Sequence, residues 1–402
     1  MATMAKLLSL DEAGSRVLER VHLLDAEDVA IEHATGRYLW DDAIAAVDLP
    51  PFASSAMDGY AVRAADVPGR LAVIGRIAAG APLDAPVGPG EAMGIATGGV
   101  VPDGADSVVP IELVVESDNG SVIEVPRPVV SMANVRPRGG DIRAGDVVVP
   151  AGTRLGPSQV GALGAAGVAS AWCVRRPHAT VLATGTELRR PGEALGPGQV
   201  YEANGAMLAA ALAAAGAEVS RLASVVDDEE ELRATLTSAL DADVVVTSGG
   251  VSVGPHDLVR RVWGELGVEE VFWRVATKPG KPVWFGVRGK TLVFGLPGNP
   301  VSALVDCELF VLPALRALQG ASEPGPVYEL GRLTAAVRRN DARDELVRAR
   351  RTVSDGVVEL EPLSGQESHM IARAARADAL VFSPRGDGEL GAGEEVRYLR
   401  IG

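Results

Sequence analysis

The sequence predicts a multi-domain α/β protein whose central part is a doubly wound, mostly parallel sheet, with β-rich modules before and after it in the chain. Its 402 residues are more than one ordinary hydrophobic core holds. From about residue 178 to 318, apolar strands alternate with glycine loops and helices. The flanking segments instead carry short β-branched runs between Gly and Pro turns.

In the central part, each expected strand is a continuous apolar run, which is typical of a parallel sheet covered on both faces. The expected strands are 179–183, 219–226, 243–247 and 291–296, and the expected helices are 203–217, 229–240 and 300–318. Ligands of such sheets bind at the carboxyl ends of the strands. The loops that follow these strands are therefore the first place to look for chemistry.

Helical character surrounds the first β-rich module. Ser9 and Glu12 form a capping-box pattern at the start of one helix, and residues 155–169 resume helical composition. Between them lie expected strands at 71–77, 107–115 and 122–125, and after Pro324 short strands and turns return. The predicted domains are a discontinuous helical or linker domain (1–47 and 142–176), an inserted β-rich domain (48–141), an α/β domain (177–325) and a C-terminal β domain (326–402).

The composition excludes several classes of function. A formal net charge of −15 disfavours binding of nucleic acid or anionic lipid across a broad surface of the protein. The N-terminus is too acidic for a signal peptide, and the alanine-rich stretch from Met207 to Val219 is interrupted by glycine, which is unlike a membrane span. Cys173 and Cys307 form no metal-binding pattern and are expected to be buried in a reducing compartment. We expect a soluble, cytoplasmic protein.

The loop SGGVSVGPHD follows the strand 243–247. Its glycines at 249 and 250, next to Ser248, let backbone amides approach an anion, although a plain strand-to-helix turn would look similar. The loop also matches the GxSxG hydrolase pattern at Ser252. We reject that nucleophile because no HGGG-like oxyanion segment precedes it and His369 lies in the separate C-terminal module.

The segment KPGKP holds two of the four lysines in a chain with 38 basic residues. Proline restricts its backbone and glycine permits a tight bend, so Lys278 and Lys281 form a pair that can hold a phosphate or oxyanion. A solvated turn is the alternative. In GLPGNP, Asn299 fits a helix N-cap and Pro300 the first helical position, and Pro297 and Pro300 are candidates for a rigid pocket wall.

Acidic residues follow two of the expected strands and the glycine loop. A carboxylate beside a bound anion needs a cation between them, and Mg²⁺ commonly fills that role. Alternatively, these acids cap helices or are solvated at the surface. That alternative is strongest for Asp227 and Asp228, which follow the strand 219–226. The candidates are Glu187, Asp227, Asp228 and Asp257.

Taken together, these motifs resemble those of the molybdopterin molybdenumtransferase family, which includes bacterial MoeA and the E domain of gephyrin. The resemblance runs over nearly the whole chain in the family's order. The motifs are PPFASSAMDGYAVR, TGGVVPDGADSVVPIE, GDIRAGDVVVPAGTRL, ATGTEL, VVVTSGGVSVGPHD, KPGKP, FGLPGNPVSA and SHM.

The resemblance implies a fold with a molybdopterin-binding α/β domain and a small C-terminal β-barrel. It implies that molybdate is inserted into adenylated molybdopterin with Mg²⁺ and release of AMP. It also implies a homodimer whose cleft is shared between subunits, with the molybdopterin adenylyltransferase and downstream molybdoenzymes as possible partners.

The residue roles that the resemblance implies fall into three groups. Those expected to be catalytic are Asp58, Asp257, Lys278 and Lys281. Those expected to bind substrate are Thr97, Asp141, Asn204, Ser248, Gly249, Gly250, Pro297, Asn299, Pro300 and Ser368. Those expected to bind the metal are Glu187, Asp227 and Asp257.

This chain departs from the family where Asp-Ser-Asn-Arg is frequent, because it has Glu202-Ala203-Asn204-Gly205 and so lacks that arginine. Leu258 also stands where an aromatic residue is frequent, and Ala53 where an acid is. Two other functions stay open at this point, namely a molybdopterin adenylyltransferase and a non-catalytic molybdopterin-binding scaffold. The choice between molybdate and tungstate also stays open.

Overall fold

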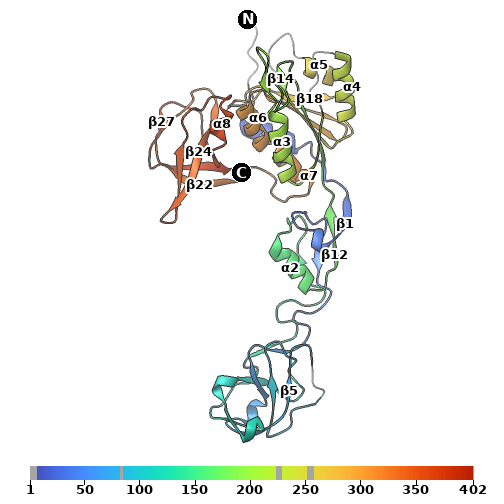
Figure 1. Ribbon diagram of the computed structural model, residues 1–402, viewed down its shortest axis with the longest axis vertical. Coiled ribbons are helices and arrows are strands. Elements are labelled where there is room, and N and C mark those ends of the chain that lie inside the picture. The colour runs from blue at the N-terminus through green and yellow to red at the C-terminus, as the bar shows by residue number, and fades with distance from the viewer. Residues whose placement is uncertain (1–6, 82–84, 223–228, 251–257, 402) are drawn as a thin grey trace. The chain divides into compact units, whose positions relative to one another are not determined.

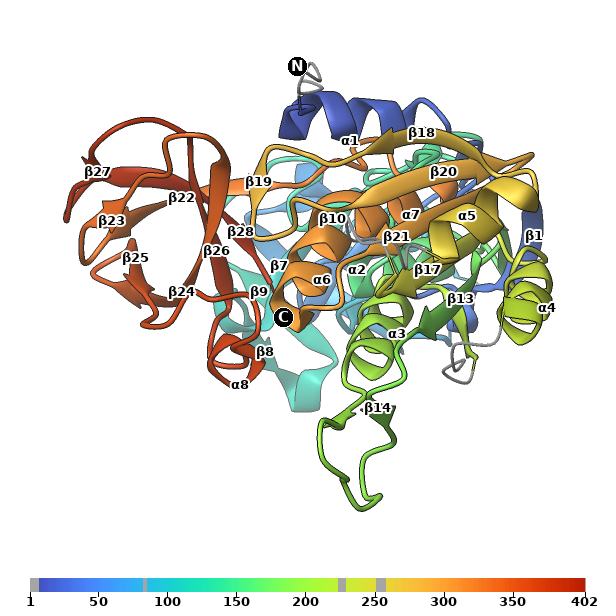
Figure 2. The same ribbon diagram turned by 90° about the horizontal axis from the view of Figure 1, so that it is seen from above.

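The computed structural model describes residues 7–81, 85–222, 229–250 and 258–401. Within them the chain forms two compact units (Figures 1 and 2). The first is built from residues 1–27, 36–40 and 173–402, and the second from residues 28–35 and 41–172. In the part of the chain that is described, no helix has both the length and the apolar character needed to span a bilayer.

A six-stranded sheet forms the centre of the first unit. Its order is β16-β13-β17-β21-β20-β18, in which the first four strands are parallel, β20 pairs antiparallel with β21, and β18 pairs antiparallel with β20. The strands are β13 (His178–Ala183), β16 (Glu218–Arg221), β17 (Val244–Ser248), β18 (Glu269–Trp273), β20 (Trp284–Arg288) and β21 (Thr291–Leu296). The predicted doubly wound, mostly parallel sheet is therefore confirmed.

Helices cover both faces of this sheet (Figure 2). Neighbouring residues of one strand point to opposite faces, so Val181 packs with the first set of helices and Leu182 with the second. The first set is α1 (Leu10–Leu18), α3 (Asn204–Ala214), α6 (Pro300–Asp306) and α7 (Leu312–Leu318). The second set is α4 (Glu229–Ala239) and α5 (Leu258–Glu265).

Two local features complete this core. The predicted capping box of α1 is present, because the Ser9 hydroxyl and the Glu12 carboxylate each accept the other residue's amide. A π-helical turn (Cys307–Val311) separates α6 from α7, which a sequence pattern of one continuous helix does not foresee.

The C-terminal residues form the expected small barrel, closed by five strands because β24 pairs with both β25 and β26. The strands are β22 (Tyr328–Leu333), β24 (Asp344–Ser354), β25 (Val357–Pro362), β26 (Ala379–Ser383) and β28 (Glu395–Arg400). The short helix α8 (Ile371–Ala374) and the pair β23 (Val337–Arg338) and β27 (Glu389–Leu390) lie in the same part of the chain. Leu346, Leu380 and Leu399 join the large core cluster of the first unit.

One strand of the barrel's sheet comes from outside the expected C-terminal domain. β19 (Thr277–Lys278) pairs in parallel with the start of β24, so that Lys278 lies opposite Glu345. The first lysine of KPGKP is therefore placed on the edge of the barrel sheet.

The second unit is β-rich. Its main sheet has the order β7-β4-β6-β5-β9-β8. The strands are β4 (Gly59–Val62), β5 (Gly69–Ile77), β6 (Glu91–Ile95), β7 (Ser107–Pro110), β8 (Val115–Ser117) and β9 (Val122–Val125). Helix α2 (Pro157–Ala165) packs on β11 (Val147–Val149) and on a 3-10 turn at Ile31–His33 in the same unit.

The remaining described elements are short. They are the strands β1 (Ala26–Ala30), β2 (Ala43–Ile44), β3 (Ser54–Ser55), β10 (Val135–Arg136), β12 (Ser170–Val174), β14 (Leu188–Arg189) and β15 (Val200–Tyr201), and 3-10 turns at Ala64–Asp66, Ile111–Leu113 and Asp118–Gly120.

Candidate functional site

The glycine loop after β17 is held tightly against the loop after β13. Thr184 donates its amide hydrogen to the Ser248 carbonyl at 2.9 Å. Gly249 has a φ of +95°, and a Cβ at this position would lie 2.5 Å from the Thr184 carbonyl oxygen. A Cβ at Gly250, whose φ is +67°, would lie 2.5 Å from a methyl group of Val259. Both positions therefore require glycine for backbone conformation and for space.

Asn204 ties three loops together at the carboxyl ends of the strands. It is the first residue of α3, and its side-chain amide donates to the Ser248 hydroxyl at 2.8 Å and to the Gly298 carbonyl at 2.7 Å. The Ser248 hydroxyl in turn donates to the Pro297 carbonyl at 3.1 Å. Since both side chains bond to loop atoms, they fix the relative positions of the loops before any ligand arrives.

The start of α6 forms another wall. Asn299 occupies the N-cap position and Pro300 the first helical position, as predicted. The Asn299 side chain makes no capping hydrogen bond, however, and is exposed. Its amide is therefore available to a ligand, while proline at the next position removes an amide hydrogen that would otherwise lack a partner.

These loops enclose a cleft of about 870 Å³ in the first unit. Eight predicted site residues line it, namely Glu187, Asn204, Ser248, Gly249, Gly250, Pro297, Asn299 and Pro300. The Glu187 carboxylate folds back over Gly185, where a Cβ would come within 2.6–2.8 Å of it. A carboxylate, two carboxamides, a hydroxyl and a glycine backbone in one cleft offer both acceptors and donors to a polar ligand.

The cleft also contains residues that were not predicted as site residues. Thr186, Tyr201, Pro282 and His369 line it. In the motif SHM, the resemblance assigns a role to Ser368 alone, and His369 enters the sequence analysis only as the histidine of the rejected hydrolase triad. A motif match alone did not indicate which of its side chains faces the cleft.

The structure does not bring the two lysines of KPGKP into this cleft lining, although Pro282 directly after them is part of it. Lys278 forms an ion pair with Glu345 at 3.0 Å and lines a separate pocket with Arg338, Arg339 and Arg343. Lys281 is exposed. The catalytic roles of Lys278 and Lys281 stay predictions. Neither residue lines the cleft, so their side chains would have to act from beside it.

Ser368 is anchored at the start of α6, where its carbonyl accepts the Val301 amide hydrogen at 3.0 Å. The segment around it is braced by Arg348, a buried residue that sequence reasoning did not single out. Arg348 donates to the carbonyls of Gly365, Glu367 and Met370, and burial lowers the pKa of its guanidinium. Its charge is thus used to hold the loop that carries Ser368 and His369.

Asp306, at the end of α6, is a second unpredicted feature. It is fully buried, and among the described residues neither carboxylate oxygen has a hydrogen-bond partner. Burial raises the pKa of Asp306 well above its usual range, so the carboxyl is held in its neutral form. A Cβ on Gly280 would lie 2.0 Å from one of its oxygens, so the KPGKP backbone runs directly over this acid.

The second unit brings together two of its three predicted residues. Asp58 accepts hydrogen bonds from the Thr97 amide at 2.7 Å and from the Thr97 hydroxyl at 3.0 Å. These bonds lower the pKa of Asp58. Asp141 is exposed, and its amide donates to the Leu49 carbonyl at 2.9 Å.

The predicted Asp227 and Asp257, together with Asp228 and Ser252, lie outside the described residues. Among the residues that are described, no group of three or more His, Cys, Asp or Glu side chains is arranged to hold a metal ion. The described part of the predicted metal site is therefore Glu187.

Three family matches cover most of the chain. Residues 8–167 match the MoeA N-terminal region (domain I and II). Residues 180–317 match a probable molybdopterin binding domain, and residues 331–401 match the MoeA C-terminal region (domain IV).

Curated relatives and solved structures agree with these matches. The chain is 34% identical to a molybdopterin molybdenumtransferase of Haemophilus influenzae, over 97% of this chain and 98% of that protein. It is 35% identical to molybdopterin molybdenumtransferase 2 of Mycobacterium tuberculosis, over 97% and 98%. A solved molybdopterin biosynthesis protein of Pyrococcus horikoshii superposes with a TM-score of 0.82 at 33% identity, over 98% of this chain and 99% of that one.

Proposed function

Since the chain belongs to the molybdopterin molybdenumtransferase family, we propose that it is an enzyme that inserts molybdenum into molybdopterin. The observation that carries this proposal is the cleft at the carboxyl ends of β13, β17 and β21. Asn204 and Ser248 hold its loops in place, and ligands of wound sheets bind at this edge.

We propose further that the substrates are molybdate and adenylated molybdopterin, and that AMP leaves. This reaction concentrates negative charge, because a phosphoanhydride is cleaved beside an incoming oxyanion. The cleft offers a donor for that charge in the Asn299 side-chain amide, which suits electrostatic stabilisation, whereas the Gly249 amide hydrogen is already donated to the Leu296 carbonyl. Lys278 and Lys281, on the loop that ends at Pro282, would add positive charge from the side.

Mg²⁺ fits the chemistry of the donors, since carboxylate oxygens are its preferred protein ligands. Glu187 would hold the ion together with Asp227 and Asp257. A bound Mg²⁺ would offset the negative charge of the phosphates. The chain's own contribution is to present Glu187 at the cleft while Asn204 and Ser248 keep the neighbouring loops rigid.

A homodimer is part of the proposal. In such a dimer Asp58, held by Thr97, and Asp141 would face the cleft of the other subunit. The lowered pKa of Asp58 keeps its carboxylate charged at neutral pH, so it would act as an acceptor or base and not as a proton donor.

The test is a reconstituted reaction with purified protein, adenylated molybdopterin, molybdate and Mg²⁺. We expect AMP to be released only when molybdate and Mg²⁺ are both present, and the product to restore activity to an apo-molybdoenzyme. Consumption of ATP with molybdopterin and no molybdate would identify an adenylyltransferase instead. Absence of both reactions would refute an enzymatic role.

A further inference from the structure

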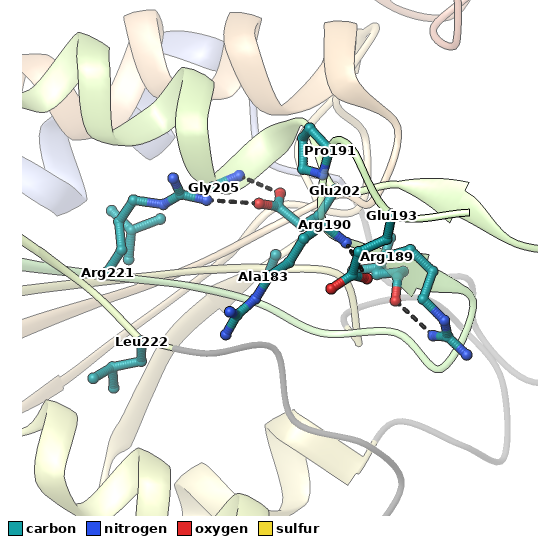
Figure 3. Close-up of a pocket in the computed structure, with 11 residues that line it drawn as sticks. Ala183, Arg189, Arg190, Pro191, Glu193, Glu202, Gly205, Arg221 and Leu222 are labelled. Carbon is teal, nitrogen blue, oxygen red and sulfur yellow. Dashed lines mark hydrogen bonds and ion pairs between the residues drawn. The ribbon is translucent and has the colours of Figure 1, made fainter. Parts of the chain in front are cut away.

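A second pocket of about 590 Å³ lies next to the cleft in the first unit, and Figure 3 shows its lining. It adjoins the cleft because Ala183, Leu188 and Glu202 line both. Three arginines and two glutamates also face it, namely Arg189, Arg190, Arg221, Glu193 and Glu202. In a chain of net charge −15, a concave site with more cations than anions attracts anionic groups locally.

Arg221 is set in this pocket by a buried partner. The Arg221 guanidinium at the end of β16 donates to Glu202 at 2.9 Å, and the other Glu202 oxygen accepts the Gly205 amide hydrogen at 2.6 Å. The Glu202 side chain is 11% exposed and that of Arg221 is 49% exposed. Both Glu202 oxygens are thus engaged, whereas the Arg221 guanidinium has five N–H donors and uses one of them toward Glu202.

Gly205 makes this arrangement possible. A Cβ at position 205 would lie 2.9 Å from the Glu202 carboxylate and 3.3 Å from the Arg221 guanidinium. The guanidinium therefore occupies space beside the start of α3 that a side chain at 205 would need.

Arg190 supplies the second cation. Figure 3 shows its side chain extending into the pocket from the segment that follows β14. Its backbone amide donates to the Glu193 carboxylate. Within the described part of the chain, its guanidinium makes no ion pair or hydrogen bond. Arg189 differs, because its guanidinium donates to the carbonyls of Thr186 and Leu188 and is thereby committed to the loop.

We propose that Arg190 and Arg221 form a subsite that binds a phosphate group of the substrate at the edge of the cleft. The proposal rests on the function proposed above, in which the cleft receives a phosphorylated pterin. Guanidinium groups bind phosphate with paired, charge-assisted hydrogen bonds. Glu202 orients Arg221 and is a positioning residue, while Arg190 is free to close on the bound group.

The experiment measures binding of AMP and of adenosine to the full-length protein by calorimetry. Adenosine has the same base and sugar as AMP but no phosphate, so the ratio of the two affinities reports the phosphate contact alone. The variants are Arg190→Gln, Arg221→Gln and the double variant. Arg350→Gln removes the same charge from a surface pair with Glu361 in the barrel and serves as the control.

We expect each single variant to weaken AMP binding by about tenfold and the double variant by more, as is typical for loss of a hydrogen bond to a charged group. Adenosine binding should stay unchanged in all variants. The subsite is overturned if the wild-type protein binds AMP no more tightly than adenosine. It is also overturned if the double variant keeps AMP affinity within twofold of wild type, or if AMP and adenosine weaken equally.

This measurement separates the subsite from the wider function. Binding of AMP needs neither molybdate nor turnover, so the affinity for AMP can be measured even if the protein is inactive in the reconstituted reaction. Conversely, molybdate-dependent release of AMP by the wild type, together with unaltered AMP binding by the double variant, would retain the function and discard the subsite. Thermal unfolding of each variant checks that the fold is intact.

Discussion

Replacing Asp306 with asparagine should change how the stability of the first unit depends on pH. The carboxyl is fully buried with no partner, and burial raises its pKa above the ordinary value of 3.8. A raised native pKa means that the folded state holds the proton more tightly than the unfolded state. The stabilisation this gives is complete below pH 3.8 and is lost as pH rises toward the native pKa.

The size of the effect follows from proton linkage. While the pH lies between the two pKa values, the wild type should lose about 1.4 kcal/mol of unfolding free energy per pH unit relative to Asp306→Asn. The gap between the two proteins should therefore widen steadily as the pH rises above 3.8, until the native pKa of Asp306 is reached. The asparagine side chain has nearly the same shape and does not titrate, so other ionisations cancel in the difference.

Denaturant unfolding at several pH values measures this, with fluorescence of the buried Trp263 and Trp284 reporting on the first unit. Asp387→Asn, which alters an exposed acid in the barrel, is the matched control and should run parallel to the wild type. Parallel curves for wild type and Asp306→Asn would show that Asp306 is ionised in the native protein, and the reasoning from burial would be refuted.

Three further substitutions test the site. Asn204→Ala removes two hydrogen bonds between loops, so it should cost about 1–3 kcal/mol of stability by thermal unfolding and slow AMP release; unchanged values would contradict its bridging role. Gly249→Ala should cost about 2 kcal/mol or more because of its φ and the 2.5 Å contact, whereas Gly264→Ala in α5, with open space around it, should be neutral or stabilising. A double-mutant cycle of Lys278→Met and Glu345→Gln should give a coupling of about 1 kcal/mol, and zero coupling would argue against the ion pair.

Much of the central fold could be predicted because its strands are continuous apolar runs. The strand expected at 291–296 has the observed bounds of β21, and the helix expected at 229–240 ends within one residue of α4. The sequence analysis did not predict β18 and β20. Within residues 269–296, all of them described, no helix separates β18, β20 and β21, so this antiparallel edge lacks the alternation of strands and helices that identified the parallel strands. The π turn at Cys307–Val311 likewise leaves no trace in an apolar helical pattern.

The meeting of the loops could be predicted from backbone chemistry, whereas the direction of individual side chains could not. Glycine and proline at 249, 250, 297 and 300 mark loops at strand ends, and these loops do meet in one cleft. Spacing alone gives no direction for Lys278, which pairs with Glu345 across a strand from the barrel. Arg348 and Asp306 act from within the core, where sequence alone does not distinguish them from surface charges.

The pairing of β19 with β24 bears on how such modules can be exchanged between relatives. The KPGKP segment begins on the edge of the barrel sheet, at Thr277 and Lys278, and Pro282 at its other end lines the cleft. A chimera that carried a foreign barrel would bring new residues opposite Thr277 and Lys278 in place of Asp344 and Glu345. Grafting should therefore succeed only when the crossover keeps that two-residue edge and the lysine loop from the same parent.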